Sequence, residues 1–201
     1  NVWDAEIREG VETFVKKHSV DTDVFCFQEA YGKMKHLCGQ LLPDYTVISE
    51  QKYVSKRDDF AQATYIRDSL KIERTELLLK DTPNIGLGIY TQIKDKGRIL
   101  CVCNFHGISK PGDKLDTPER LLQSEGVINF FKDIEGPKII GGDFNLDPNS
   151  GSVKMFEENG YRNLIKGFGV RTTRNRLVWE KYPENKQYFS DYVFVSSDVK
   201  V

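Results

Sequence analysis

The sequence predicts a single α/β domain of the mixed α+β kind. At 201 residues, with 39% hydrophobic and 29% charged residues, the chain has the size and composition of one globular domain with a substantial core. Helical and strand patterns alternate near the start and again near residue 138, while several strand patterns follow one another between them. Because consecutive strands do not suit a purely alternating βαβ protein, we expect a system of mixed sheets.

Local patterns predict the elements of the first half of the chain. Val11, Phe14 and Val15 recur at helical spacing with charged residues between them, which predicts an amphipathic helix over residues 4–18. The apolar run at 23–27 predicts a buried strand, and the run at 98–105 alternates as a strand does. Further strands are predicted at residues 45–49, 63–67, 70–79 and 86–93.

The second half begins with a helix-start signal, because Thr117 provides a hydroxyl cap and Pro118 suits the first turn. The expected apolar face of this helix consists of Leu121, Leu122, Val127, Ile128, Phe131 and Ile134. A strand at 138–142, a helix at 151–158 and a strand at 192–196 complete the prediction. The loop at 109–116 and the polar stretch at 171–187 are expected to be mobile and to rim an active site.

Charge and cysteine content limit the classes of partner and compartment. The formal net charge is −1, from 29 Lys plus Arg against 30 Asp plus Glu. This balance weakens the prediction of a non-specific nuclease without excluding one, because a neutral total is compatible with a local basic rim. Cys26, Cys38, Cys101 and Cys103 lack zinc-site spacing, and we expect buried free thiols in a reducing, cytoplasmic compartment. No membrane-spanning run or secretory signal is visible. We expect a monomer.

The segment 138–148, Lys-Ile-Ile-Gly-Gly-Asp-Phe-Asn-Leu-Asp-Pro, is the most informative part of the chain. Residues i and i+2 of an extended chain share a face, so Asp143 and Asn145 should stand together while Phe144 packs behind them. A carboxylate that accepts a proton from water, beside an amide that donates to a charged oxygen, forms a phosphate site. The alternative is an Asx-rich turn, because Asp, Asn, Gly and Pro are ordinary turn residues.

Gly-Gly-Asp-Phe-Asn after an apolar strand resembles the Gly-Asp-x-Asn signature of the endonuclease/exonuclease/phosphatase superfamily, the DNase I-like metal-dependent phosphodiesterases and phosphatases. Four other segments fit the family's pattern in the same order. The resemblance implies a four-layer sandwich of two mixed β-sheets flanked by helices, with active-site loops at one edge of the sheet pair. It also implies that residues 1–201 are one such domain, truncated at both ends.

The resemblance further implies a metal site. In the family a Gln-Glu at the end of the first buried strand supplies the principal metal ligand, which assigns that role to Glu29. Asn1, in Asn1-Val2-Trp3, resembles the family's first motif and would support the metal or the phosphate. Mg²⁺ prefers a few carboxylate oxygens and keeps several waters, so it is the expected cofactor, with Mn²⁺ as the alternative. The competing interpretations are a solvated strand-end Glu29 and a frayed terminal Asn1.

His106 and Asp191 complete the implied site. The Asn-Phe-His that ends at His106 resembles the Asn-x-His of the sphingomyelinase branch, whose histidine contacts the phosphate. A structural histidine is the alternative. Asp191, followed by Tyr192, resembles the Asp-Tyr strand whose carboxylate orients a histidine of a later Ser-Asp-His segment.

No Ser-Asp-His occurs in residues 1–201, whose histidines are His18, His36 and His106. The Ser-Asp-Tyr at 190–192 could be a degenerate copy, as in a catalytically impaired relative. We prefer truncation, because residues 193–196 continue a core strand. The Arg-Thr-Thr-Arg at 171–174 lies where relatives place substrate contacts, although a solvated basic loop explains it equally well. The Arg-Leu-Leu-Gln at 120–123 resembles a structural helix of the family.

These assignments predict divalent-metal-dependent hydrolysis of a phosphate ester by a phosphodiesterase or nuclease. The expected roles are metal binding by Glu29 and Asn1, proton abstraction from water by Asp143, phosphate contacts by Asn145 and His106, and histidine orientation by Asp191. The alternatives are a phosphatase or sphingomyelinase-like hydrolase, and a non-catalytic phosphate-binding relative without the imidazole. Substrate identity stays open, because members of this superfamily act on DNA, RNA, lipids and inositol phosphates.

Overall fold

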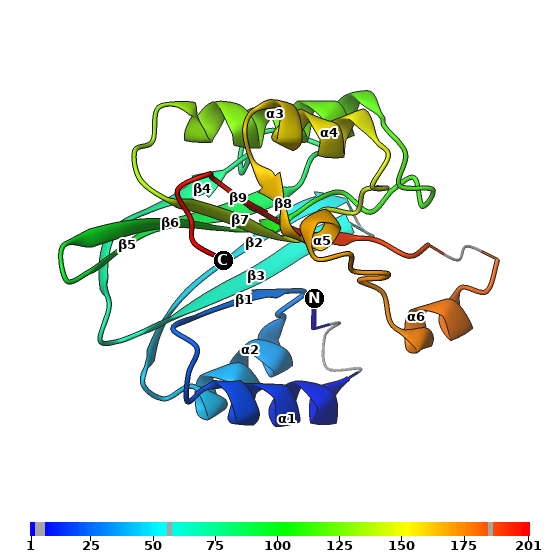
Figure 1. The fold of residues 1–201 in the computed structure, drawn as a ribbon. Coiled ribbons are helices and arrows are strands. Elements are labelled where there is room, and N and C mark those ends of the chain that lie inside the picture. The colour runs from blue at the N-terminus through cyan, green and yellow to red at the C-terminus, as the bar shows by residue number, and fades with distance from the viewer. Residues whose placement is uncertain (3–6, 56–57, 185–186) are drawn as a thin grey trace.

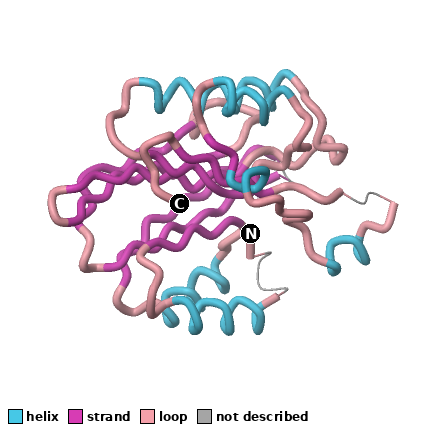
Figure 2. Tube along the Cα trace, in the orientation of Figure 1, coloured by secondary structure: helices cyan, strands magenta, loops and turns pink. Residues whose placement is uncertain are grey.

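The computed structural model describes residues 1–2, 7–55, 58–184 and 187–201. The described elements, in chain order, are α1 (Arg8–His18), β1 (Val24–Gln28), α2 (Gly32–Leu41), β2 (Tyr45–Ser55), β3 (Asp58–Arg67), β4 (Lys71–Leu78), β5 (Leu87–Asp95), β6 (Arg98–His106), α3 (Pro118–Lys132), β7 (Lys138–Asp143), α4 (Gly151–Glu158), β8 (Arg162–Asn163), α5 (Leu164–Gly167), α6 (Arg176–Lys181) and β9 (Asp191–Val195). Helices α1 and α2 cover one sheet, a second sheet stacks on it, and α3 and α4 cover the outer face (Figure 1). Figure 2 shows the strands in the two central layers. The predicted four-layer sandwich is confirmed.

The first sheet has three antiparallel strands in the order β1-β3-β2. Alternate residues of a strand face opposite sides of its sheet, and β1 is apolar on both sides. Phe25 and Phe27 pack with Met34 of α2. Cys26, between them, packs with Val102 of the second sheet. β1 therefore lies between two layers, in agreement with its prediction as a buried strand.

The second sheet has six strands in the order β4-β5-β6-β7-β9-β8. It is mixed, because β6 and β7 pair in parallel while its other pairs are antiparallel. Parallel neighbours need a crossover connection, which α3 provides. Phe105 and Ile140 pack under α3 and α4, and Val102 faces the first sheet. The parallel pairing makes β6 and β7 end at the same edge of the sheet.

The helix faces differ from the prediction at three positions. Phe14 of α1 is 53% exposed, and Leu121 and Leu122 of α3 are exposed as well. α3 instead buries Arg120 and Gln123 beside its apolar residues. For α3 the prediction was wrong because helical spacing identifies a face, but it does not reveal which polar groups a neighbouring loop requires.

Several elements also differ in extent. α2, β8, α5 and α6 were not predicted, and β2 and β3 form a longer hairpin than the runs at 45–49 and 63–67 indicated. α4 agrees with its prediction at both ends, and Thr117 caps α3 as expected by accepting from the backbone N–H of Arg120 at 3.2 Å. Residues 4–6 of the first predicted helix, and Trp3 of the first motif, lie outside the described residues.

All four cysteines are free thiols. Cys101 and Cys103 pack in the core beneath α3, and burial raises the pKa of Cys26 to about 12 and that of Cys38 to about 11. Such thiols stay protonated at neutral pH. Within the described part of the chain, no helix combines the length and the apolar character that crossing a membrane requires.

Lys52 of β2 connects the two sheets. Its side chain is buried, and its ammonium group lies within hydrogen-bonding distance of four backbone carbonyls of the turn between β4 and β5, which share its three N–H donors. The acceptors are the carbonyl oxygens of Leu79 at 2.5 Å, Thr82 at 2.7 Å, Ile85 at 3.0 Å and Gly86 at 3.1 Å. A cation from the first sheet therefore organises a turn of the second.

We predict that Lys52→Met lowers the free energy of unfolding by about 3 kcal/mol, because the buried carbonyls lose a charged donor. Lys80→Met is the matched control. Lys80 pairs with Glu50 at 2.9 Å on the surface, and such exposed pairs contribute less than about 1 kcal/mol. Urea denaturation followed by circular dichroism measures both variants. Equal losses would show that the carbonyl contacts do not stabilise the sheet pair.

Candidate active site

Strand pairing brings three of the predicted site residues to one edge of the second sheet. His106, the last residue of β6, lies opposite Asp143, the last residue of β7, in the parallel ladder. Asp143 lies opposite Asp191, the first residue of β9, in the antiparallel ladder. These side chains are neighbours because the register of three strands puts them side by side.

Glu29 approaches the same point from the first sheet. It follows β1 with a φ of 56°, a left-handed conformation that turns the chain at the strand end. The ligand atoms of Glu29, His106 and Asp143 all lie within 4.8 Å of one another. Asn1 connects the two carboxylates, because its Nδ2 donates to Glu29 Oε1 at 2.7 Å and to Asp143 Oδ2 at 2.9 Å. Four predicted residues from both sheets therefore converge.

Asp143 is a buried carboxylate with several hydrogen-bond donors. Its Oδ1 accepts from Ser190 Oγ at 2.6 Å and from the backbone N–H of Asn145 at 3.1 Å, and its Oδ2 accepts from Asn1. Burial opposes ionisation, but the Lys114 ammonium and the bonds from Ser190 and Asn1 lower the pKa of Asp143 overall. Asp143 is therefore ionised at neutral pH.

Asn145 reaches the site through a turn. The strand ends at Asp143, and Asn145 has a φ of 55°, so the prediction that both residues share the face of an extended chain is wrong. The amide Oδ1 accepts from Lys114 Nζ at 2.5 Å, and Nδ2 donates to the Gly107 carbonyl at 3.0 Å. Phe144 is fully buried behind them, as predicted. The acid and the amide still line one pocket, by a different backbone route.

Gly142 allows β7 to run close to β6 at the site. It has a φ of 144°, and a Cβ atom there would collide with the backbone carbonyl of Phe105. Glycine adopts this conformation without the steric cost that any side chain would add. The glycine that precedes Asp143 in the motif is therefore needed to bring that carboxylate beside His106.

His106 is a buried, neutral imidazole. Its ring meets the ring of Phe60 edge-on, with 5.0 Å between centroids, and burial lowers its pKa to about 4. Nδ1 is buried and has no hydrogen-bond partner within the described part of the chain. A neutral imidazole with an uncommitted nitrogen can bind a cation or form a hydrogen bond with a ligand.

Asp191 lines the same pocket as Asp143, but its pKa is raised where that of Asp143 is lowered. Burial, followed by the neighbouring Asp143 charge, raises its pKa. Among the histidines, His106 lies beside Asp143, whereas His18 and His36 belong to α1 and α2. The role of Asp191 in orienting a histidine stays a prediction.

A pocket of about 310 Å³ opens onto the three carboxylates Glu29, Asp143 and Asp191. Val178 of α6 and Tyr182 form an apolar part of its wall, and Figure 1 shows α6 standing apart from the four layers. The polar stretch that begins at residue 171 therefore rims the site, as predicted. Of the two arginines at 171–174, Arg174 lines this pocket, whereas Arg171 lines a separate cavity with residues of α4 and α5.

Sequence reasoning missed Lys114. This residue is 5% exposed, and its Nζ donates to Ser190 Oγ at 3.1 Å as well as to Asn145. Burial lowers its pKa to about 8. No local pattern could have identified it, because a single lysine in a polar loop is usually solvated.

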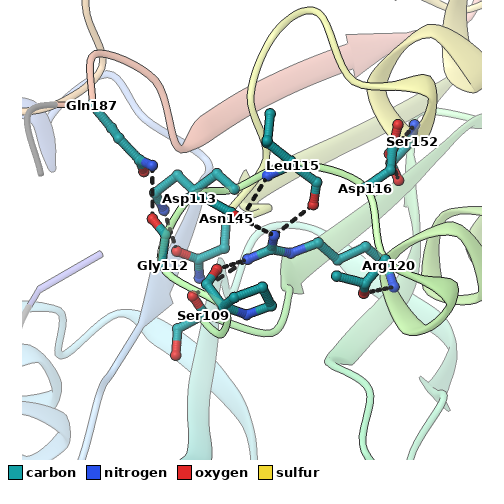
Figure 3. A network of polar contacts seen from close by, with 12 residues as sticks. Ser109, Gly112, Asp113, Leu115, Asp116, Arg120, Asn145, Ser152 and Gln187 are labelled. Carbon is teal, nitrogen blue, oxygen red and sulfur yellow. Dashed lines mark hydrogen bonds and ion pairs between the residues drawn. The ribbon is translucent and has the colours of Figure 1, made fainter.

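Arg120 of α3 holds the loop that carries Lys114 (Figure 3). Its buried guanidinium donates to the carbonyls of Leu115, at 2.6 Å, and of Pro111, and it pairs with Asp113 at 3.3 Å. These contacts tie the loop at 109–116 to α3, which does not support the expectation of a mobile loop. They explain why the Arg-Leu-Leu-Gln segment buries an arginine.

The profile of the Endonuclease/Exonuclease/phosphatase family matches residues 5–201. The chain belongs to this family. The match covers almost the whole chain and agrees with the resemblance that the Gly-Asp-x-Asn segment suggested. A search of curated proteins gave no match.

Solved structures of similar fold include members of the same family. One from Bacteroides thetaiotaomicron, described as an endonuclease/exonuclease/phosphatase family protein, has 21% identity, covers 94% of this chain and 75% of its own, and has a TM-score of 0.73. A mannosyl-6-phosphatase of the same organism has 19% identity, coverages of 95% and 78%, and a TM-score of 0.73. D. rerio TDP2 with a single strand DNA product has 17% identity, coverages of 98% and 80%, and a TM-score of 0.70. At these identities the likeness establishes the DNase I-like fold.

We predict that Gly142→Ala destabilises the protein by about 3 kcal/mol or more, because the added methyl group meets the Phe105 carbonyl and the φ angle disfavours alanine. Gly10→Ala is the control. Gly10 lies in α1 with open space around it, so alanine there should raise the free energy of unfolding by at most about 1 kcal/mol. Thermal and urea unfolding measure both. A Gly142→Ala variant as stable as the parent protein would contradict the close packing of β6 and β7.

Proposed function

We propose that this family member hydrolyses phosphodiesters with the help of a divalent metal ion. The observation that carries the proposal is the meeting of Glu29 and Asp143, carboxylates from opposite sheets that share the Nδ2 donor of Asn1. Two carboxylates this close repel each other unless a donor or a cation lies between them. Hard divalent ions suit such an oxygen-rich site.

The residues present fit a divalent cation. Glu29, supported by Asn1, would hold it through a carboxylate oxygen, and ligand atoms of Asp143 and His106 lie within 4.8 Å of that of Glu29. Mg²⁺ favours carboxylate and water ligands, whereas Mn²⁺ also occupies oxygen sites and follows the same geometry. When bound, the ion would neutralise negative charge on the phosphoryl group.

The remaining residues suit the steps of phosphate ester hydrolysis. Asp143, held ionised by its donors, would orient water and accept its proton while the water oxygen forms the new bond to phosphorus and the bond from phosphorus to the ester oxygen breaks. The departing alkoxide would then take a proton from the solvent. Asn145 has one N–H committed to Gly107 and a second N–H available for a phosphoryl oxygen. His106 would be a further phosphate contact. Asp191 would orient an imidazole.

A diester is favoured by the lining of the pocket. Besides the carboxylates, Val178 and Tyr182 line it, and their apolar surface would suit a second substituent on the phosphate. The relatives of similar fold include a mannosyl-6-phosphatase as well as TDP2 with a DNA product, so the fold is compatible with either class. A monoesterase, a sphingomyelinase-like hydrolase and a phosphate-binding protein without turnover are the outcomes that a substrate panel would separate.

We predict that Asp143→Asn lowers kcat about 10³-fold, because the amide can neither accept the proton nor keep the negative charge. Asp133→Asn, which changes an exposed aspartate at the end of α3, is the matched control and should leave kcat unchanged. The assay follows turnover of nucleic acids, bis-p-nitrophenyl phosphate and sphingomyelin by the full-length protein. Full activity in Asp143→Asn would end the assignment.

We further predict that EDTA abolishes turnover and that added Mg²⁺ restores it. Glu29→Gln should raise the Mg²⁺ concentration for half-maximal activity at least about tenfold, because the neutral amide is a weaker ligand for a hard cation. Glu158→Gln changes an exposed residue of α4 and should not alter this concentration. Turnover that survives EDTA, or an unchanged Mg²⁺ requirement in Glu29→Gln, would contradict a metal bound at Glu29.

A further inference from the structure

Lys114 is a buried cation with no direct part in the proposed reaction. It lies behind the pocket wall, and its Nζ contacts Asn145 Oδ1 at 2.5 Å and Ser190 Oγ at 3.1 Å. An ammonium group is costly to bury, so these two oxygens and the nearby carboxylate charge of Asp143 must compensate it. Both oxygens belong to residues that line the pocket.

The contact with Lys114 fixes the orientation of the Asn145 amide. Oδ1 faces the ammonium, and Nδ2 faces the Gly107 carbonyl at 3.0 Å. A rotation of the amide by half a turn would put NH₂ against an ammonium and oxygen against a carbonyl, so only one orientation is stable. Donation by the ammonium also polarises the amide, which makes the second N–H a stronger donor.

The contact with Ser190 fixes one face of Asp143. Because Ser190 Oγ accepts from Lys114, its own hydroxyl hydrogen is directed to Asp143 Oδ1, which lies 2.6 Å away. The backbone N–H of Asn145 donates to the same oxygen at 3.1 Å. Oδ1 thereby accepts two hydrogen bonds, and Oδ2, which accepts from Asn1 on the side of Glu29, is the oxygen that would act in the pocket.

The surroundings of Lys114 are built to hold it in place. Lys114 has a left-handed backbone with a φ of 61°, and its carbonyl oxygen accepts from the backbone N–H of Asp147 at 2.8 Å. Arg120 anchors the residues on both sides of it, through the carbonyls of Pro111 and Leu115. Figure 3 shows this loop wrapped around the Arg120 guanidinium, with Asn145 beside it.

We propose that Lys114 is the positioning residue of the site: one buried ammonium orients the Asn145 amide directly and the Asp143 carboxylate through Ser190. This inference rests on the proposed function. It adds the residue that aligns the proton acceptor, Asp143, with the hydrogen-bond donor to the phosphate, Asn145. It needs no contact between Lys114 and the substrate.

The first test compares Lys114→Met and Lys114→Arg with Lys33→Met, an exposed position on α2. Loss of alignment costs roughly two orders of magnitude, so kcat of Lys114→Met should fall about 100-fold while KM changes less than about threefold. Lys114→Arg keeps the charge and its donors, and it should recover at least about tenfold of that loss. A residue that only fills space would tolerate methionine better than arginine. That order, or an unchanged kcat in Lys114→Met, would overturn the proposal.

A double-mutant cycle tests the route through Asn145. Lys114→Met should reduce kcat much less in an Asn145→Ala background than in the parent protein, because part of its effect is already lost. Ser190→Ala tests the second route and keeps Lys114 in place, and it should lower kcat about tenfold. Losses that multiply in full in the cycle, or an unaltered kcat in Ser190→Ala, would refute the corresponding route.

A measurement independent of turnover separates this inference from the proposed function. In ¹⁵N-labelled protein, the side-chain NH₂ signals of Asn145 are identified by their disappearance in Asn145→Ala. They should shift in Lys114→Met and stay in place in Lys33→Met. If the parent protein hydrolyses no phosphate ester, the proposed function fails while this readout still decides the orientation. Unmoved signals in Lys114→Met would overturn it, and if that variant does not fold, Lys114→Gln serves in the same comparison.

Discussion

A buried cluster of amides between the two sheets determines where Glu29 stands relative to Asp143. Asn104 of β6 accepts from Gln28 Nε2 at 2.7 Å and donates to the carbonyl of Ala63 at 3.2 Å, so one side chain of the second sheet bonds to both β1 and β3 of the first. Gln62 of β3 donates in the other direction, to carbonyls of β5 and β6. A polar group buried between sheets is costly if it loses its hydrogen bond. The two sheets therefore cannot separate at this edge without a loss of stability, and these bonds hold their spacing. Gln28 immediately precedes Glu29, and Asn104 lies two residues before His106.

The charge balance of the site explains its remaining features. Glu29, Asp143 and Asp191 converge on one pocket, while Lys114 contributes a single buried positive charge behind it. Burial raises the pKa of Asp191, and the neighbouring negative charge of Asp143 raises it further. A divalent cation and the Arg174 side chain would offset the negative charge on the pocket side. The ammonium of Lys114, on the core side, keeps Asp143 ionised and orients its neighbours.

Much of the architecture could be predicted because its patterns are local. The strand at 138–143, the capped helix that starts at Pro118 and the helix at 151–158 each follow from spacing, caps and glycines within a few residues. The failures share a cause as well. Leu121 and Leu122 are exposed because α3 turns Arg120 and Gln123 inward to serve loops that are distant in sequence, and no spacing rule contains that demand. Asp116 of the same loop adds an acceptor to the first turn of α4, because its carboxylate accepts from the backbone N–H of Gly151 at 2.6 Å.

The sequence by itself determined the family, the order of the strands that carry Glu29, His106, Asp143 and Asp191, and the residue types available for phosphate chemistry. Those conclusions depend on local motifs. Each motif lies within a few consecutive residues, so it can be recognised without any knowledge of tertiary contacts. Only the tertiary structure decided that Asn145 enters through a left-handed turn and that Asn1 connects two carboxylates. It alone revealed that Lys114 is buried among the site's oxygens. The physical reason is that hydrogen bonds between sheets and loops join residues far apart in the chain, so no local pattern encodes them.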